Sequence, residues 1–139
     1  MNAALPVQLA LHGAIILMAG LVGGLCFARA IQRQRGEVAW RVVHAGGCSA
    51  GVLLLALAVP SQWMRLGTVP AMTMAVGFIA GAYLLCAGMY IAAICDTRGI
   101  PGGGAPLNRL VAALYASGTV LTLLGGTLLV VGLLGRLVE

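Results

Sequence analysis

The stretch LGTVPAMTMAVGFIAGAYLLCAGMYIAAIC, residues 66–95, runs for 30 residues without a charged side chain. A helix needs about 20 apolar residues to cross the hydrocarbon core of a bilayer. Three further uncharged stretches cover residues 1–28, 42–64 and 110–135, and each has room for one span but not for two. The sequence therefore predicts an all-α integral membrane protein whose four spans pack as one four-helix bundle.

The composition agrees with this prediction. Hydrophobic residues make up 61% of the chain and charged residues only 8%, whereas a soluble domain carries roughly 25% charged residues. Every proline lies at the boundary of a predicted span, where its missing N–H does least harm. We therefore expect one domain over residues 1–139, with the lipid bilayer around it and spans at about 5–31, 38–59, 71–95 and 107–138.

The charges indicate an orientation. The eight basic residues are all arginines, and six of them lie in or beside residues 32–37 and 96–106. Basic residues accumulate on the cytoplasmic side of membrane proteins, which places these two loops in the cytoplasm. This distribution explains the net charge of +5 better than nucleic-acid binding does, so we expect no nucleic acid as a partner.

Small residues recur at a spacing that lets helices approach closely in lipid. GxxxG pairs of this kind predict a tightly packed bundle and leave self-association open. The four cysteines lie in or at the edge of spans, without a CxxC motif, and we interpret them as packing residues. The pairs are Gly20/Gly24, Gly47/Gly51 and Gly77/Gly81, and the cysteines are Cys26, Cys48, Cys86 and Cys95.

Two histidines lie within predicted spans, where polar groups are costly. At 1.5 Å per residue, His44 lies about 9 Å from the basic end of its span and His12 about 28 Å, a difference of about 19 Å. One metal ion therefore cannot bind both in one subunit. His44 either bonds to a neighbouring helix or binds a metal, and a haem on His44 would keep an open sixth position.

Other polar residues lie near the depth of His44. Tyr90 is also about 9 Å deep and is the phenol best placed for chemistry there. Tyr83 lies two turns further in, and Tyr115 is expected to be structural. Each phenol on the third span has the alternative of a hydrogen bond between helices. The arginines that could hold haem propionates, or simply anchor the helices at the interface, are Arg33, Arg41, Arg98 and Arg109.

Three segments carry a resemblance to a known family. They are His12-Gly13 in the first span, Trp40-Arg41-Val42-Val43-His44-Ala45-Gly46 in the second, and Thr97-Arg98-Gly99-Ile100 before a Gly/Pro-rich loop. In these segments the chain resembles bacterial styrene oxide isomerase, a small four-span membrane enzyme. Both histidines fall at the positions that the family uses.

The resemblance implies a homotrimer in the bacterial inner membrane with haem b at its subunit interfaces. It implies His44 as the axial ligand of the iron. The ferric haem of the family acts as a Lewis acid on the oxygen of a small apolar epoxide, which becomes an aldehyde without net redox change. This agrees with one histidine ligand and an open sixth position.

The chain departs from the family at three polar positions. The family's tyrosine falls on Met89, next to Tyr90, and its asparagines fall on Leu85 and Ala50. Tyr90 is therefore the candidate catalytic residue. Two alternatives stay open, a haem-binding membrane protein without isomerase activity (for gas sensing or haem handling) and a cofactor-free accessory membrane subunit.

Overall fold

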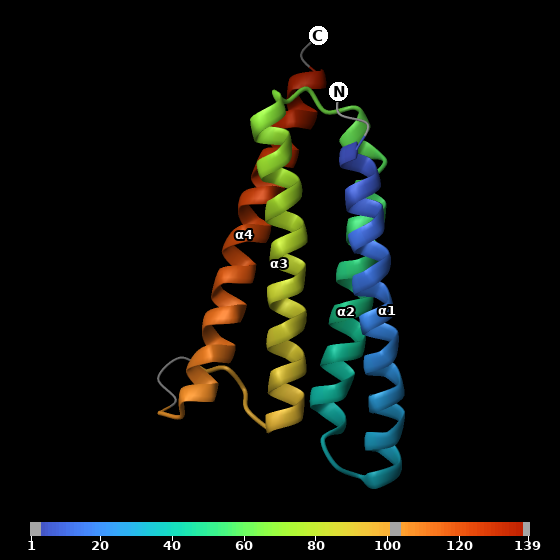
Figure 1. Cartoon of the computed structure of the whole chain (residues 1–139), viewed down its shortest axis with the longest axis vertical. Helices are drawn as coiled ribbons and strands as arrows, with labels where there is room; N and C mark the ends of the chain where they lie inside the picture. The colour runs from blue at the N-terminus through green and yellow to red at the C-terminus, as the bar shows by residue number, and fades with distance from the viewer. Residues whose placement is uncertain (1–3, 101–103, 138–139) are drawn as a thin grey trace.

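The computed structural model describes residues 4–100 and 104–137, and the regular structure of these residues is helical (Figure 1). Four helices are each long and apolar enough to cross a membrane, which confirms the all-α prediction with four apolar helices. They are α1 (Ala4–Arg33), α2 (Glu37–Leu57), α3 (Thr68–Cys95) and α4 (Pro106–Leu137), and a short 3-10 helix, η1 (Pro60–Gln62), follows α2.

The helix ends differ slightly from those expected. α3 begins at Thr68, three residues before the predicted start, because Pro70 lies in the first turn, where its missing N–H leaves no hydrogen bond unmade. α2 ends at Leu57, and η1 carries the chain on to Gln62. α1 continues to Arg33, two residues beyond its predicted end.

The helices form two antiparallel pairs, α1 with α2 and α3 with α4, and α3 also contacts α1 and α2 (Figure 1). The connections after α1 and after α3 lie at one end, and the start of α1 and the end of α4 lie at the other. The predicted placement of the two arginine-rich loops at one end is thus confirmed. We call this end the basic end; its cytoplasmic location stays a prediction.

Glycines close the seam between α1 and α2. A Cβ atom on Gly20 would lie 2.6 Å from the backbone carbon of Gly47, and one on Gly51 would lie 2.5 Å from the backbone nitrogen of Leu17. Side chains cannot fit at these distances, so the two backbones touch only because the residues are glycines. This confirms the packing role predicted for two of the GxxxG pairs.

Glycines also allow close approach of the backbones of α3 and α4. A Cβ atom on Gly77 would lie 2.8 Å from the carbonyl oxygen of Leu121, and one on Gly118 would lie 3.0 Å from that of Gly81. The third GxxxG pair therefore also packs helix on helix. The partners on α4, Gly118 and Gly125, were not among the pairs singled out from the sequence.

Apolar side chains fill the centre of the bundle and cover its outside. Leu9, Ile16, Leu54 and Met74 are buried between α1, α2 and α3. The outer surface is apolar too, as a bundle surrounded by lipid requires. On α4 the exposed large apolar residues include Val120, Leu123, Val130 and Leu134.

Candidate functional site

His44 lies in the seam between α1 and α2, with its imidazole directed at α1. Its Nδ1 atom is 3.0 Å from the carbonyl oxygen of Gly20, and a Cβ atom on Gly24 would lie 2.8 Å from Nδ1. Because a carbonyl oxygen only accepts hydrogen bonds, we assign the ring proton to Nδ1. Nε2 then keeps its lone pair, and it makes no hydrogen bond to the described part of the chain.

This arrangement fits a metal ligand. Histidines that bind metals usually donate their other ring N–H to a carbonyl or carboxylate, which fixes the tautomer. The described residues contain no cluster of three or more His, Cys, Asp or Glu side chains suited to a metal ion. A haem needs no such cluster, because its porphyrin supplies four nitrogen ligands and the protein adds an axial one. His44 therefore fits a haem better than a bare metal ion.

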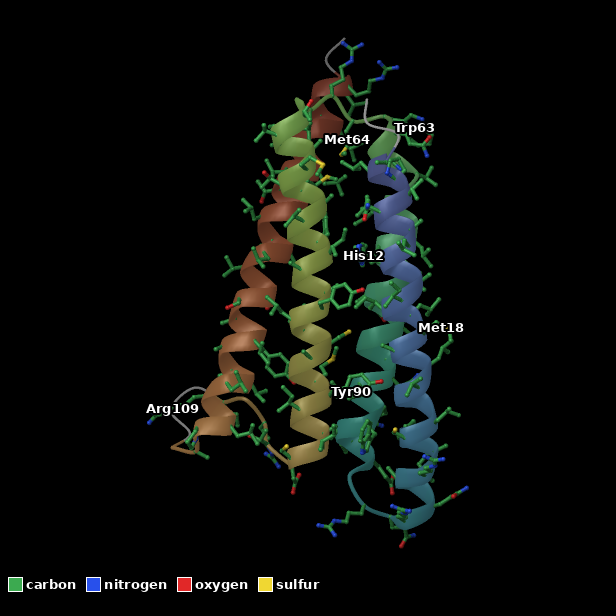
Figure 2. The ribbon with its side chains drawn as sticks, in the orientation of Figure 1. His12, Met18, Trp63, Met64, Tyr90 and Arg109 are labelled. Carbon is green, nitrogen blue, oxygen red and sulfur yellow. The ribbon has the colours of Figure 1, made fainter. Side chains whose placement is uncertain are left out.

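Tyr90 approaches the same turn of α1 from α3. Its hydroxyl donates a hydrogen bond of 2.6 Å to the carbonyl oxygen of Ala19, and its ring packs edge to face on Trp40 at 5.9 Å between centroids. Figure 2 shows Tyr90 directed from α3 toward the α1/α2 pair. Tyr90 and His44 thus contact consecutive carbonyls of α1, at the similar depth that the sequence predicts. The contact with Ala19 is the interhelical hydrogen bond considered as the alternative role of this phenol.

His12 belongs to a separate contact nearer the opposite end. Its Nδ1 atom lies 3.1 Å from the hydroxyl of Tyr83 on α3, and the rings pack edge to face. His12 precedes Gly20 by eight residues, a rise of about 12 Å. Figure 2 likewise shows His12 nearer than Tyr90 to the end where α1 begins.

The predicted depth difference of about 19 Å was too large. It assumed that the first two spans end at one level. In the structure Gly23 faces Val43, so ten residues of α1 but only six of α2 lie between that contact and the basic end. The conclusion that the two histidines belong to different sites stands.

The predicted propionate-binding arginines occupy different surfaces of the chain. Arg33 lines an open hollow of about 450 Å³ between α1, α2 and α3. Arg98 lines a second hollow of about 750 Å³, which also includes Met89 and Tyr115. Arg41 is exposed one turn before His44, and Arg109 is exposed at the start of α4 (Figure 2). Within one subunit, only Arg41 adjoins His44 along its helix.

Asn108 has a structural role that the sequence analysis missed. Its Oδ1 atom accepts hydrogen bonds from the Thr97 hydroxyl (3.0 Å) and the Ile100 N–H (3.2 Å), and its Nδ2 donates to the Ile100 carbonyl (2.6 Å). One amide thus fixes the segment Thr97–Ile100 against α4. An asparagine in the first turn of an apolar helix is the signal that would have pointed to it.

The chain matches the model of a known protein family. A family model described as styrene oxide isomerase matches residues 6–134. This chain belongs to the styrene oxide isomerase family. The match includes both histidines and parts of all four helices, and it confirms the resemblance seen in the sequence. No curated protein and no solved structure matches the chain.

Apolar packing fills the positions where the resemblance places the family's other polar residues. A Cβ atom on Gly46 would lie 2.5 Å from the Met89 sulfur, so the Met89 side chain packs directly against the backbone of α2. Leu85 packs on Gly118 of α4 in the same way. Ala50 packs against the core. At those three positions this chain therefore has apolar helix contacts.

Proposed function

We propose that this chain is a membrane isomerase that uses haem b to convert a small apolar epoxide into an aldehyde. In this reaction one C–O bond of the epoxide breaks, a hydride moves to the neighbouring carbon and a C=O bond forms, so no external electron donor or acceptor is needed. The family match supports the reaction class. The observation that carries the cofactor is the His44 imidazole, whose Nδ1 bonds to Gly20 and whose Nε2 remains available.

In this proposal Nε2 of His44 would hold the iron of a haem, and the bound ferric haem would supply Lewis acidity toward an epoxide oxygen. Propionates directed to the basic end would meet arginine side chains, which hold carboxylates by charge-assisted hydrogen bonds. Arg41 is the nearest of these along the helix. In a homotrimer, Arg33, Arg98 and Arg109 of this subunit or of a neighbouring copy would be the further candidates to hold the propionates.

The neighbouring residues position the ligand and exclude water. The carbonyl oxygen of Gly20 accepts the hydrogen bond from the imidazole N–H of His44. Gly24 leaves room for the imidazole because it has no side chain. The Tyr90 hydroxyl donates a hydrogen bond to the adjacent carbonyl oxygen of Ala19. In this proposal Tyr90 therefore positions the turn of α1 that contacts His44. For a direct catalytic role its hydroxyl would have to leave Ala19. Apolar surroundings would keep water from the epoxide, which water would convert to a diol.

The test is an absorption spectrum and an activity assay on the detergent-purified protein. We expect a Soret band after haem supplementation and conversion of styrene oxide to phenylacetaldehyde, with no diol, measured by gas chromatography. A protein that stays colourless contradicts the cofactor proposal. Colourless protein that co-purifies with a larger membrane partner would favour an accessory subunit.

The second candidate is a haem-binding membrane protein without isomerase activity, for gas sensing or haem handling. The apolar contacts of Met89 and Leu85 and the occupied hydroxyl of Tyr90 favour it, because they leave few polar groups for an epoxide. It predicts a Soret band that shifts on addition of carbon monoxide, and no aldehyde from a panel of aryl and alkyl epoxides. Aldehyde formed from any of these epoxides in a haem-dependent manner excludes it.

A further inference from the structure

The hollow beside Arg33 combines positive charge with an apolar wall. Its lining includes Arg29 and Arg33 from the last turns of α1 and Arg35 from the following turn. Cys26, Ala93 and Ile94 line the same hollow. The hollow therefore lies where the membrane-spanning part of the bundle meets the basic end.

The described residues neutralise the positive charge of this hollow only in part. Asp96 lines the hollow with the three arginines, yet Arg29, Arg33 and Arg35 form no ion pair within the described residues. Three guanidinium groups beside a single carboxylate leave two positive charges in excess. Guanidinium groups bind phosphate oxygens through paired hydrogen bonds, so this excess suits a phosphate.

The rest of the lining suits a lipid more than a free anion. Ile94 exposes 67% of its surface, which offers contact to an acyl chain on the membrane side. Trp40 contributes an indole at the level where tryptophans meet headgroups. Its Nε1 atom lies near Gly36 at the rim of the hollow and donates no hydrogen bond to a described residue, so it is available to a headgroup oxygen.

We propose that this hollow binds the headgroup of one anionic phospholipid per subunit. Arg29, Arg33 and Arg35 hold the phosphate, Trp40 donates to a headgroup oxygen, and an acyl chain lies along Ile94. The bound lipid joins α1, α2 and α3 at the basic end, where α1 extends beyond the start of α2.

His44 does not line this hollow. Tyr90 and Trp40 pack together on the side of α1 and α2 that faces α3, and the hollow is bordered by Trp40 on that side. His44 instead contacts the Gly20 and Gly24 side of α1. The lipid proposal therefore does not depend on haem binding. It assigns Arg33 to the lipid phosphate, which leaves Arg41, Arg98 and Arg109 as candidates for the haem propionates.

The experiment is native mass spectrometry of the full chain in mixed micelles that contain equal amounts of phosphatidylglycerol and phosphatidylcholine. We expect one phosphatidylglycerol per subunit, preferred at least about tenfold over phosphatidylcholine. The variant Arg29→Gln/Arg33→Gln should lose at least about tenfold in this preference, since each arginine near a membrane surface contributes on the order of 1 kcal/mol toward anionic lipid. The matched control Arg98→Gln/Arg109→Gln removes the same charge from the same end and should change the preference less than about twofold.

Each other outcome is decisive. Equal losses in both double variants would mean general surface charge and would overturn the site. Loss of the Soret band without loss of lipid in Arg29→Gln/Arg33→Gln would assign the hollow to haem propionates instead. Complete displacement of the lipid by inorganic phosphate would show a small-anion site. If the double variant does not elute as a single species, Arg35→Gln alone carries the test, with an expected loss of about threefold.

Discussion

The two helix pairs, α1 with α2 and α3 with α4, share one packing device and differ in the side chains that their seams hold. In both seams, α1/α2 and α3/α4, glycines bring two backbones into contact. Only the α1/α2 seam also contains an imidazole, that of His44. The ring fits there because Gly24 has no side chain, and it forms a hydrogen bond with the carbonyl oxygen of Gly20. Close glycine packing is thus the common scaffold, and the candidate site arises where one partner residue is a histidine.

The largest effects should come from filling either seam. Gly20→Ala in α1 and Gly77→Ala in α3 each place a methyl group within 3 Å of a facing backbone. We expect both to lower the free energy of unfolding by about 1–3 kcal/mol, as overpacking does. Only Gly20→Ala should also weaken the Soret band, measured beside the melting temperature in detergent. Equal loss of haem in both variants would contradict a difference between the seams.

Gly24→Ala tests the space beside the imidazole. The added methyl group would lie 2.8 Å from Nδ1 of His44, so the ring must shift, which disturbs its hydrogen bond to the Gly20 carbonyl. Loss of a partner that orients a metal ligand typically lowers metal affinity 10- to 100-fold, and we expect a haem titration to show a change of about this size. The control is Gly126→Ala in α4, whose nearest neighbouring atom is 4.0 Å away. An unchanged affinity in Gly24→Ala would show that the ring is not held as described.

Asn108→Ala tests a contact of the α3/α4 pair alone. It removes three hydrogen bonds that fix Thr97–Ile100, and each such bond contributes about 1 kcal/mol. We expect a loss of about 1–3 kcal/mol in unfolding free energy and faster cleavage after α3 by an added protease. Haem content should stay unchanged. A large loss of haem would connect this loop to the site and remove the distinction between the two pairs.

The smallest effects should come from the two phenols that join the pairs. Tyr83→Phe and Tyr90→Phe each remove one hydrogen bond from α3 to α1, at a cost of about 1 kcal/mol or less within a membrane. As a positioning residue, Tyr90 should also lower epoxide turnover, but less than about tenfold, whereas Tyr83→Phe should not. A general acid or base contributes about 100-fold or more. A loss of that size in Tyr90→Phe with haem retained would assign the phenol a direct catalytic role.

Helix formation was predictable from the sequence because charge and proline patterns are local. They placed all four spans to within about three residues and put both arginine-rich loops at one end. The GxxxG spacing also predicted which faces of α1, α2 and α3 pack. The depth of His44 and Tyr90 followed from counting residues along single helices.

The sequence did not predict the individual contacts between helices, because these depend on how far one helix is shifted along another. The contact of Gly23 with Val43 sets the stagger of α1 against α2, and it changed the distance between the histidines. The hydrogen bond from His44 to Gly20 joins residues 24 positions apart. The role of Asn108 likewise depends on a loop folding back onto α4. No local pattern determines these contacts, because each depends on packing between distant segments.

The central claim is that the chain has one haem ligand, in the α1/α2 seam. The direct measurement is the absorption spectrum of purified wild-type protein, His44→Ala and His12→Ala after identical haem supplementation. We predict a Soret band in the wild type and in His12→Ala and its loss in His44→Ala, with partial return when imidazole is added to that variant. A full Soret band in His44→Ala, or its loss in His12→Ala alone, would contradict this account.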